Sequence, residues 1–270
     1  MSTETNAYIL GTDLEEMNRL GLQHQVWASE AQTGWDIAQY NKGMTILDLG
    51  SGPGFCTREL AKIVGQEGKV IAVDKSEVYL NYINQINSIQ QLNIETLLTD
   101  FNNLKLTDNS IDGMYSRWAL AWVADVESVL AKVYSALRPG GKVVIHEYSD
   151  WMTHQIVPSH PTVQKAIKSC FQSFEDSEGT INIGKDLPQM LSQSGFKVTS
   201  TRTMSKMSSP NQFTWQWPRS FYDSYWPKIQ AMGYLTEAEL NEAKKELESI
   251  EKLPHAILIC PTLIEIVAEK

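Results

Sequence analysis

Short apolar segments recur along the first 150 residues of the chain, and each is bounded by polar or turn-forming residues. Segments of this length predict buried strands, since a core helix would need a longer periodic run. The predicted strands are residues 45–50, 68–74, 93–100, 110–118 and 142–148.

Between these strands, longer segments carry apolar residues at helical spacing. The predicted helices are residues 57–64, 76–91 and 126–137, and the last ends at Pro139 and the glycine pair that follows it. Strands that alternate with helices in this way predict an α/β fold with a mostly parallel sheet.

Beyond residue 150 the alternation is interrupted. It resumes with a predicted helix at 187–195 and a strand at 196–204, and residues 261–269 predict a closing strand, the seventh. Residues 205–255 are rich in aromatic residues and largely helical. Residues 1–42 are polar with scattered apolar positions, which predict a short helix or two.

The chain is acidic, with 23 lysines and arginines against 32 acidic residues and a net charge of −9. Without a basic run, nucleic-acid binding is not expected as its main activity.

The first residues lack the features of a signal peptide, and Pro261 and Glu265 interrupt the apolar C-terminal segment, so no membrane association is expected. The widely spaced Cys56, Cys170 and Cys260 then indicate reduced thiols and a cytoplasmic protein.

The turn after the first strand, LDLGSGPGF (47–55), has glycine at every second position. Glycine allows a sharp turn and a close approach to a ligand, and such a turn between a strand and a helix suits a nucleotide. A dinucleotide fingerprint would need glycine where Phe55 stands. The spacing G-x-G-x-G, with Asp48 two residues ahead, instead resembles motif I of the class I S-adenosylmethionine-dependent methyltransferases.

This resemblance implies roles for residues at the ends of the next two strands. In the family, the glycine loop wraps the amino-acid part of the cofactor. Asp74 then corresponds to the carboxylate that accepts hydrogen bonds from the two ribose hydroxyls. Asp100 corresponds to the acidic residue against the adenine amino group, beside Phe101 as an apolar wall, although a simple turn cap is an alternative role for Asp100.

Two further segments, SIDGMYSRWALAWV (110–123) and LRPGGKVVIHE (137–147), resemble motifs of the small-molecule branch of the same family. The resemblance implies a doubly wound, seven-stranded Rossmann-like sheet that binds S-adenosylmethionine. Because ligands of open α/β sheets bind at the carboxyl ends of the strands, Ser116, Arg117 and Trp118 are expected near the cofactor.

Residues 8–27 resemble a leader that folds over the cofactor in some small-molecule methyltransferases, with matches at Tyr8, Arg19 and Gln23. Arg19 or Gln23 could meet the cofactor carboxylate. An ordinary amphipathic docking helix is an equally open interpretation. The expected cofactor-binding residues are Tyr8, Gln23, Asp48, Gly50, Ser51, Gly52, Gly54, Asp74, Lys75, Asp100, Phe101, Ser116 and Arg117.

Methyl transfer from a sulfonium needs a base only when the acceptor must lose a proton. His146 and Glu147 end the fifth strand and point to opposite faces, so at most one of them can face the pocket. Tyr8, Tyr148 and His154 are further candidates, and no catalytic base is assigned. The histidines and cysteines show no ligand pair of the usual spacing, so no metal is expected.

Residues 213–226, FTWQWPRSFYDSYW, are aromatic at seven of fourteen positions. Such density indicates a cap over a flat apolar acceptor, a self-association surface, or the packed core of a helical lid. The segment lies between the last two strands and could reach over the carboxyl edge of the sheet.

The sequence therefore predicts a methyltransferase that acts on a small, apolar or aromatic molecule. A nicotinamide-dependent oxidoreductase and a cofactor-binding sensor without catalysis are the competing interpretations, and the oligomeric state is open. The expected parts are an N-terminal helical lid (1–42), a cofactor-binding core (43–204), an inserted helical cap (205–255) and a closing strand (256–270).

Overall fold

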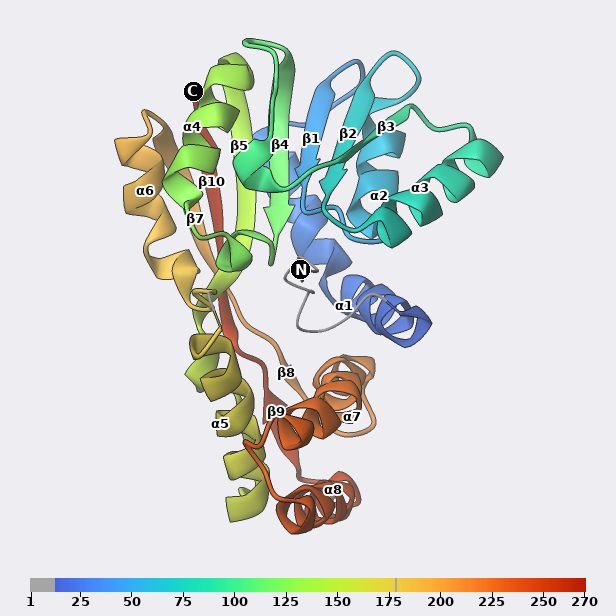
Figure 1. Ribbon diagram of the computed structural model, residues 1–270, viewed down its shortest axis with the longest axis vertical. Coiled ribbons are helices and arrows are strands. Elements are labelled where there is room, and N and C mark those ends of the chain that lie inside the picture. Colours follow the sequence, from blue (N-terminus) through green and yellow to red (C-terminus); the bar gives the residue numbers. More distant parts are fainter. Residues whose placement is uncertain (1–12, 178) are drawn as a thin grey trace, which may run out of the picture.

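The computed structural model describes residues 13–177 and 179–270, which are arranged around one central sheet (Figure 1). Its strands are β1 (Thr45–Leu49), β2 (Lys69–Asp74), β3 (Ile94–Leu98), β4 (Ile111–Arg117), β5 (Leu137–Asp150), β7 (Lys197–Met204) and β10 (Thr262–Glu269). Their order is β3-β2-β1-β4-β5-β10-β7, and only β10 runs antiparallel to its neighbours β5 and β7. The prediction of a seven-stranded, mostly parallel sheet is confirmed.

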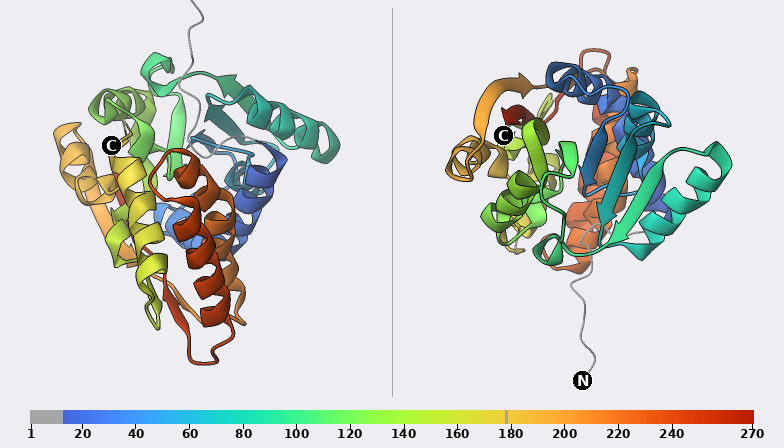
Figure 2. Two further views of the ribbon diagram at one scale, coloured as in Figure 1. Left: turned by 60° about the horizontal axis from the view of Figure 1, so that its bottom comes forward. Right: turned by 90° about the horizontal axis from the view of Figure 1, so that it is seen from above.

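Helices cover both faces of this sheet, because its central strands are apolar on both sides (Figures 1 and 2). One face carries α2 (Phe55–Val64), α3 (Glu77–Gln90) and the second half of α1 (Leu14–Ala38). The other face carries α4 (Val126–Ala136) and α6 (Leu187–Gln193). The predicted doubly wound arrangement is therefore confirmed.

The described part of the N-terminal segment, residues 13–42, forms one helix of 25 residues, which is longer than the short helix or two expected. Ala31, Trp35 and Ala38 follow one another at helical spacing and are buried against the sheet with Tyr115 and Val144. The second half of the expected lid is thus part of the core. Within the described residues, no helix has the length and apolarity needed to cross a membrane.

A second layer of structure lies beyond the carboxyl ends of the parallel strands (Figure 1). This cap contains a small sheet, ordered β6-β9-β8, and three helices that share one apolar cluster. Its elements are β6 (Gln155–Val157), α5 (Pro161–Glu175), β8 (Met207–Ser208), α7 (Gln216–Ala231), α8 (Glu237–Glu251) and β9 (Ile257–Ile259). In Figure 2, α5 lies beside α7 and α8.

The cap differs from the expected insertion in its boundaries. Besides residues 205–255, it includes β6 and α5, which lie inside the range expected to form the cofactor-binding core. The reason is that Val163, Ile167 and Phe174 of α5 pack against apolar residues of α7 and α8.

Short 3-10 helices complete the described part of the fold: η1 (Phe101–Asn103), η2 (Leu120–Trp122), η3 (Trp151–Thr153), η4 (Ile183–Lys185) and η5 (Phe213–Trp215).

Most of the aromatic side chains of residues 213–226 are core residues of the cap. Trp215, Tyr222, Tyr225 and Trp226 are each at most 1% exposed. Tyr222 stacks on Trp226 with ring centroids 4.5 Å apart. For these four residues, the interpretation as packing of a helical lid is confirmed.

A buried ionic network explains how α1 docks on the sheet. Glu265 of β10 is 1% exposed, and it accepts hydrogen bonds from His146 Nε2 at 2.9 Å and from Arg202 at 3.0 Å. Burial raises the pKa of Glu265, but the bonds from His146 and Arg202 outweigh it and lower the pKa below its ordinary value. Gly34 of α1 lies directly over this network, where a side chain would not fit.

We expect Gly34→Ala to lower the free energy of unfolding by about 1–3 kcal/mol, the usual cost of overpacking. The added Cβ would lie 2.6 Å from Glu265 Oε2 and 2.8 Å from Val144 Cγ1. This loss should appear in urea unfolding even though alanine is favoured over glycine by roughly 1 kcal/mol in an exposed helix. The exposed Ser29→Ala in the same helix should cause no loss. Equal or greater stability of the Gly34 variant would contradict the packing of α1 in the core.

Candidate functional site

The glycine turn after β1 has the backbone conformation that its sequence predicts. Gly50 and Gly54 both have φ of +79°, in the left-handed region that favours glycine. They are also needed for space, since a Cβ on Gly50 would overlap Ala119 Cβ, and one on Gly54 would lie 2.5 Å from Ile83 Cγ1. The turn therefore fits closely between the start of α2, α3 and the loop after β4.

A cleft opens over this turn at the carboxyl ends of β1, β2 and β4. Ten of the thirteen residues expected to bind the cofactor line it: Gln23, Asp48, Gly50, Ser51, Gly52, Asp74, Lys75, Asp100, Phe101 and Arg117. Gly54 and Ser116 lie behind its wall, where Gly54 is the N-cap of α2 and the Ser116 hydroxyl donates to the carbonyl of Leu49 at 3.0 Å. Tyr8 lies outside the described residues.

Asp74 joins the glycine turn to the end of β2. Its Oδ2 accepts a hydrogen bond from the Gly52 amide and its Oδ1 accepts one from the Ser76 amide, both at 2.8 Å. Burial raises the pKa of this carboxyl group, against the lowering effect of the two amides. Each oxygen keeps a further lone pair that can face the cleft.

Asp48 and Asp100 differ in their surroundings. Asp48 is 2% exposed and accepts a hydrogen bond from the Thr57 hydroxyl at 2.5 Å, and burial raises its pKa to about 6. Asp100 is exposed and accepts from the Asn102 amide at 2.8 Å, which makes it the N-cap of η1. The turn-cap role is thus present, together with a position on the cleft.

Arg117 brings a positive charge to the cleft. Its Nη2 donates to His24 Nδ1 at 3.2 Å, so the proton of that imidazole is on Nε2, which donates to Glu59 at 3.1 Å. Its Nη1 is buried and has no hydrogen-bond partner within residues 13–177 and 179–270. This nitrogen is a donor available to an anionic group in the cleft.

Arg19 does not lie on the same cleft. It binds both carboxylate oxygens of Glu16, at 2.6 and 2.7 Å, and donates to Gln23 Oε1 at 3.0 Å. It borders a second cavity instead. The expectation that Arg19 could meet the cofactor carboxylate is therefore not supported by its position.

That second cavity lies between the sheet edge and the cap, next to the first cleft. Both are bordered by Gln23, Trp118 and Trp122. The second cavity is mainly aromatic, and its aromatic lining residues are Trp118, Trp122, Tyr148, Trp151, Phe174, Trp217 and Phe221.

Two aromatic residues of the cap reach the sheet edge, as the sequence position of their segment suggested. Trp217 stacks on Trp118 with ring centroids 5.8 Å apart, and its Nε1 donates to Gln23 Oε1 at 2.8 Å. Phe221, one turn further along α7, lines the same cavity. The cap therefore closes over the edge of the sheet through these two side chains.

The sequence did not identify several residues that line the first cleft. Tyr79 and Tyr115 belong to a helix and a strand that were predicted, whereas Trp122 lies on η2, which was not. The contact of all three with the cleft depends on tertiary packing. For Trp118 only nearness to the cofactor was expected. Its φ of +55°, unusual for a bulky residue, turns its ring toward both cavities.

His146 and Glu147 face opposite sides of the sheet, as predicted. His146 is bonded to Glu265 beneath α1, and burial lowers its pKa. Glu147 lines the second cavity, and burial raises its pKa to about 8. His154 also lines that cavity, where its Nδ1 donates to the carbonyl of Ile259 at 2.7 Å and its Nε2 accepts from the Tyr222 hydroxyl.

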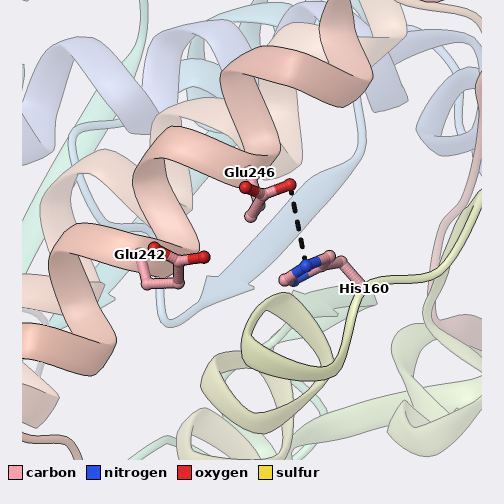
Figure 3. A group of neighbouring side chains, drawn as sticks. All are labelled: His160, Glu242 and Glu246. Atoms are coloured by element: carbon pink, nitrogen blue, oxygen red, sulfur yellow. Dashed lines mark ion pairs between the residues drawn. The ribbon is translucent and has the colours of Figure 1, made fainter.

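Among the described residues, one group has the composition and spacing of a metal site, namely His160, Glu242 and Glu246 (Figure 3). Their ligand atoms lie within 4.8 Å of one another, and His160 Nε2 is 3.6 Å from Glu246 Oε2. The group joins the start of α5 to α8 and borders neither cavity. The expectation of no metal compared only histidine and cysteine spacings, so it missed this pair of glutamates one turn apart.

The comparisons with known proteins agree with the fold and the cleft. A profile described as a methyltransferase domain matches residues 40–212. Over 109 residues the chain is 37% identical to phosphoethanolamine N-methyltransferase 1 of Triticum aestivum, covering 39% of this chain and 21% of that protein. It is 30% identical over 116 residues to the ubiquinone/menaquinone biosynthesis C-methyltransferase of Escherichia coli, covering 42% of this chain and 46% of that protein.

Each of these matches thus spans less than half of the curated relative. Among solved structures, an S-adenosylmethionine dependent methyltransferase from Mesorhizobium loti is similar with a TM-score of 0.56 and 17% identity. That likeness covers 92% of this chain and 100% of the other, and it shows a shared fold. Since the matching profile spans more than half of the chain and includes the glycine turn, the protein belongs to the S-adenosylmethionine-dependent methyltransferase family, with S-adenosylmethionine as its cofactor.

Proposed function

We propose that the protein transfers a methyl group from S-adenosylmethionine to a small, apolar or aromatic molecule. The observation that carries this proposal is the aromatic cavity that adjoins the cofactor cleft at Gln23, Trp118 and Trp122. Methyl transfer is an in-line displacement, so the acceptor must lie next to the methyl group, on the far side from the sulfur. Two adjoining cavities meet that requirement.

The polar groups of the first cleft fit the cofactor. Gly50 and Gly52 offer backbone without side chains to the cleft. Ser51 Oγ and Arg117 Nη1 are buried without a partner in the described part of the chain. The Arg117 guanidinium suits the cofactor carboxylate, because charge-assisted hydrogen bonds are the strong ones. Gln23, at the border of the two cavities, is proposed to support the same end of the cofactor.

The other end of the cleft suits the nucleoside. Asp74, with a free lone pair on each oxygen, is proposed to accept bonds from the two ribose hydroxyls. Asp100 and Phe101 are proposed to contact the base, with Lys75 and Asp48 completing the polar lining. When bound, the cofactor supplies an activated methyl group, and these residues orient it.

The aromatic cavity supports a small acceptor with a large apolar surface. Aromatic side chains bind flat or apolar ligands well, and a closed lining excludes water from the reaction. By name, one relative is an N-methyltransferase of phosphoethanolamine, and the other is a C-methyltransferase of ubiquinone and menaquinone biosynthesis. The net charge of −9 argues against nucleic acid as the acceptor.

We further propose that the first half of α1 and the cap together form the cover of the site. Leu20 and Gln23 line the cofactor cleft, while Trp217 and Phe221 line the aromatic cavity. The bond from Trp217 to Gln23 joins the cap to α1.

We also propose a cytoplasmic location. The buried cysteines Cys56, Cys170 and Cys260 form no disulfide, in keeping with that location.

S-adenosylhomocysteine should raise the melting temperature of the protein, because it binds only the native state, and NAD should not.

Asp74→Ala should weaken S-adenosylhomocysteine binding at least tenfold in calorimetric titration, since each lost charged hydrogen bond is worth about 1.5–3 kcal/mol. The exposed Asp108→Ala, on the turn before β4, serves as a control that keeps the affinity. Stabilisation by NAD alone, or an unchanged affinity of the Asp74 variant, would refute these assignments.

Two phenylalanines of the cap provide a matched test of the acceptor cavity. Phe221 lines it, whereas Phe213 is 51% exposed on the same segment. With a metabolite extract as the source of acceptor, Phe221→Ala should form S-adenosylhomocysteine roughly tenfold more slowly, the effect of losing about 1.4 kcal/mol of contact. Phe213→Ala should keep the rate.

Cofactor affinity should be the same in both phenylalanine variants, because neither side chain borders the cofactor cleft. Equal rates for the two variants would remove the aromatic cavity from the proposed function. A wild-type protein that binds S-adenosylmethionine but forms no product with any extract would instead favour a cofactor sensor.

A further inference from the structure

A buried carboxyl group with one oxygen uncommitted borders the aromatic cavity. Glu147, near the end of β5, is fully buried and lines the cavity. Its Oε1 accepts a hydrogen bond from the Leu120 amide at 2.8 Å. Its Oε2 has no hydrogen-bond partner among the residues that the structure describes. A buried oxygen without a partner is unfavourable, so a hydrogen-bond donor that binds there is stabilised.

The neighbouring polar groups of the cavity are already bonded to other residues. Arg19 binds the Glu16 carboxylate, which balances its charge. His154 is bonded to Tyr222 and Ile259, and burial lowers its pKa to about 4, so it is neutral at pH 7. An ionised Glu147 would therefore be a negative charge with no cation of the described residues paired to it.

The lack of a paired cation determines the protonation state of Glu147 before a ligand binds. Burial raises the pKa of Glu147 to about 8, against the lowering effect of the backbone amides around Leu120. At pH 7 most molecules then hold Glu147 as the neutral acid. A cation bound at Oε2 would supply the missing charge and favour the carboxylate.

The rest of the cavity also favours a cation. The faces of aromatic rings attract ammonium groups, and the attraction grows when water is excluded. Seven aromatic side chains line this cavity, and the guanidinium carbon of Arg117 lies 5.0 Å from the centroid of the Trp118 ring, a cation–π contact at the junction with the cofactor cleft. Glu147 and these rings all border the same cavity, which adjoins the cofactor cleft.

We propose that the methyl acceptor is a small amine, which enters as an ammonium ion and is held by Glu147 Oε2 within the aromatic rings. This inference rests on the proposed function and specifies its substrate class. It agrees with the name of the wheat relative, an N-methyltransferase of phosphoethanolamine.

The chemistry balances without a further reactant. One N–H proton of the ammonium passes to the Glu147 carboxylate, which leaves a lone pair on nitrogen. That lone pair forms the N–CH3 bond while the S–CH3 bond breaks, and the electron pair of the broken bond stays on sulfur. The product is a methylated ammonium ion, and Glu147 releases its proton to solvent when the product leaves. Glu147 is a catalytic residue in this scheme because it touches the reacting nitrogen.

The test uses two probes of equal shape and different charge. Choline carries a permanent cation that cannot titrate, and 3,3-dimethylbutan-1-ol is its neutral carbon analogue. Calorimetric titration of the protein saturated with S-adenosylhomocysteine at pH 8.5 should give an affinity for choline at least tenfold above that for the alcohol. Glu147→Gln, which keeps the bond to Leu120, should reduce this preference below threefold. Glu15→Gln, an exposed change on α1, should keep it.

The pH dependence provides a second readout. Choline affinity should rise between pH 7 and pH 9, because Glu147 must lose its proton to bind the cation and its pKa is raised to about 8. His154 is neutral and the Arg19 guanidinium charged across this range, so neither supplies the effect. In the Glu147→Gln variant the profile should be flat.

Equal affinities for the two probes, a preference that survives Glu147→Gln, or no choline binding to the loaded protein would each overturn the inference. Failure of the proposed function has a different signature. In that case S-adenosylhomocysteine itself does not bind, or no methyl group reaches any small molecule.

Discussion

The loop from Trp118 to Trp122 must be held in one conformation, and both cavities depend on it. Glu147 provides the main constraint through the bond from the Leu120 amide, and the Trp118 amide donates to the carbonyl of His146 at 3.0 Å. On one side Ala119 fits against Gly50, where no side chain could be accommodated. On the other side Trp118 meets Trp217 of the cap. The loop is thus the wall shared by the cofactor cleft and the aromatic cavity.

α1 also links the cofactor cleft to the aromatic cavity. Its second half is buried on the sheet, over the network of Glu265, His146 and Arg202. Its first half carries His24, which holds Arg117, and Gln23, which accepts bonds from Arg19 and Trp217. A rigid base in the core therefore positions residues of α1 at both cavities, which is how a helix can cover a site without being a detachable lid.

The parts of the fold and site predicted from sequence are those with local signals. The first five strands, the glycine turn and Asp74 follow from apolar spacing and from residues needed at one backbone position. The cap boundary was missed because the apolar face of α5 packs against α7 and α8, which are distant from it in the sequence. The positions of Gly54 and Ser116 behind the cleft wall likewise depend on packing with Ile83 and Leu49, which no local pattern reveals.

The central claim is that the cofactor cleft and the aromatic cavity form one site that meets at Trp118 and Trp122. A crystal structure of the complex with S-adenosylmethionine tests it most directly. The account predicts that the sulfonium methyl group faces the junction bounded by Gln23, Trp118 and Trp122, and that Arg117 binds the cofactor carboxylate. A methyl group directed away from the aromatic cavity, toward solvent or another surface, would contradict the account.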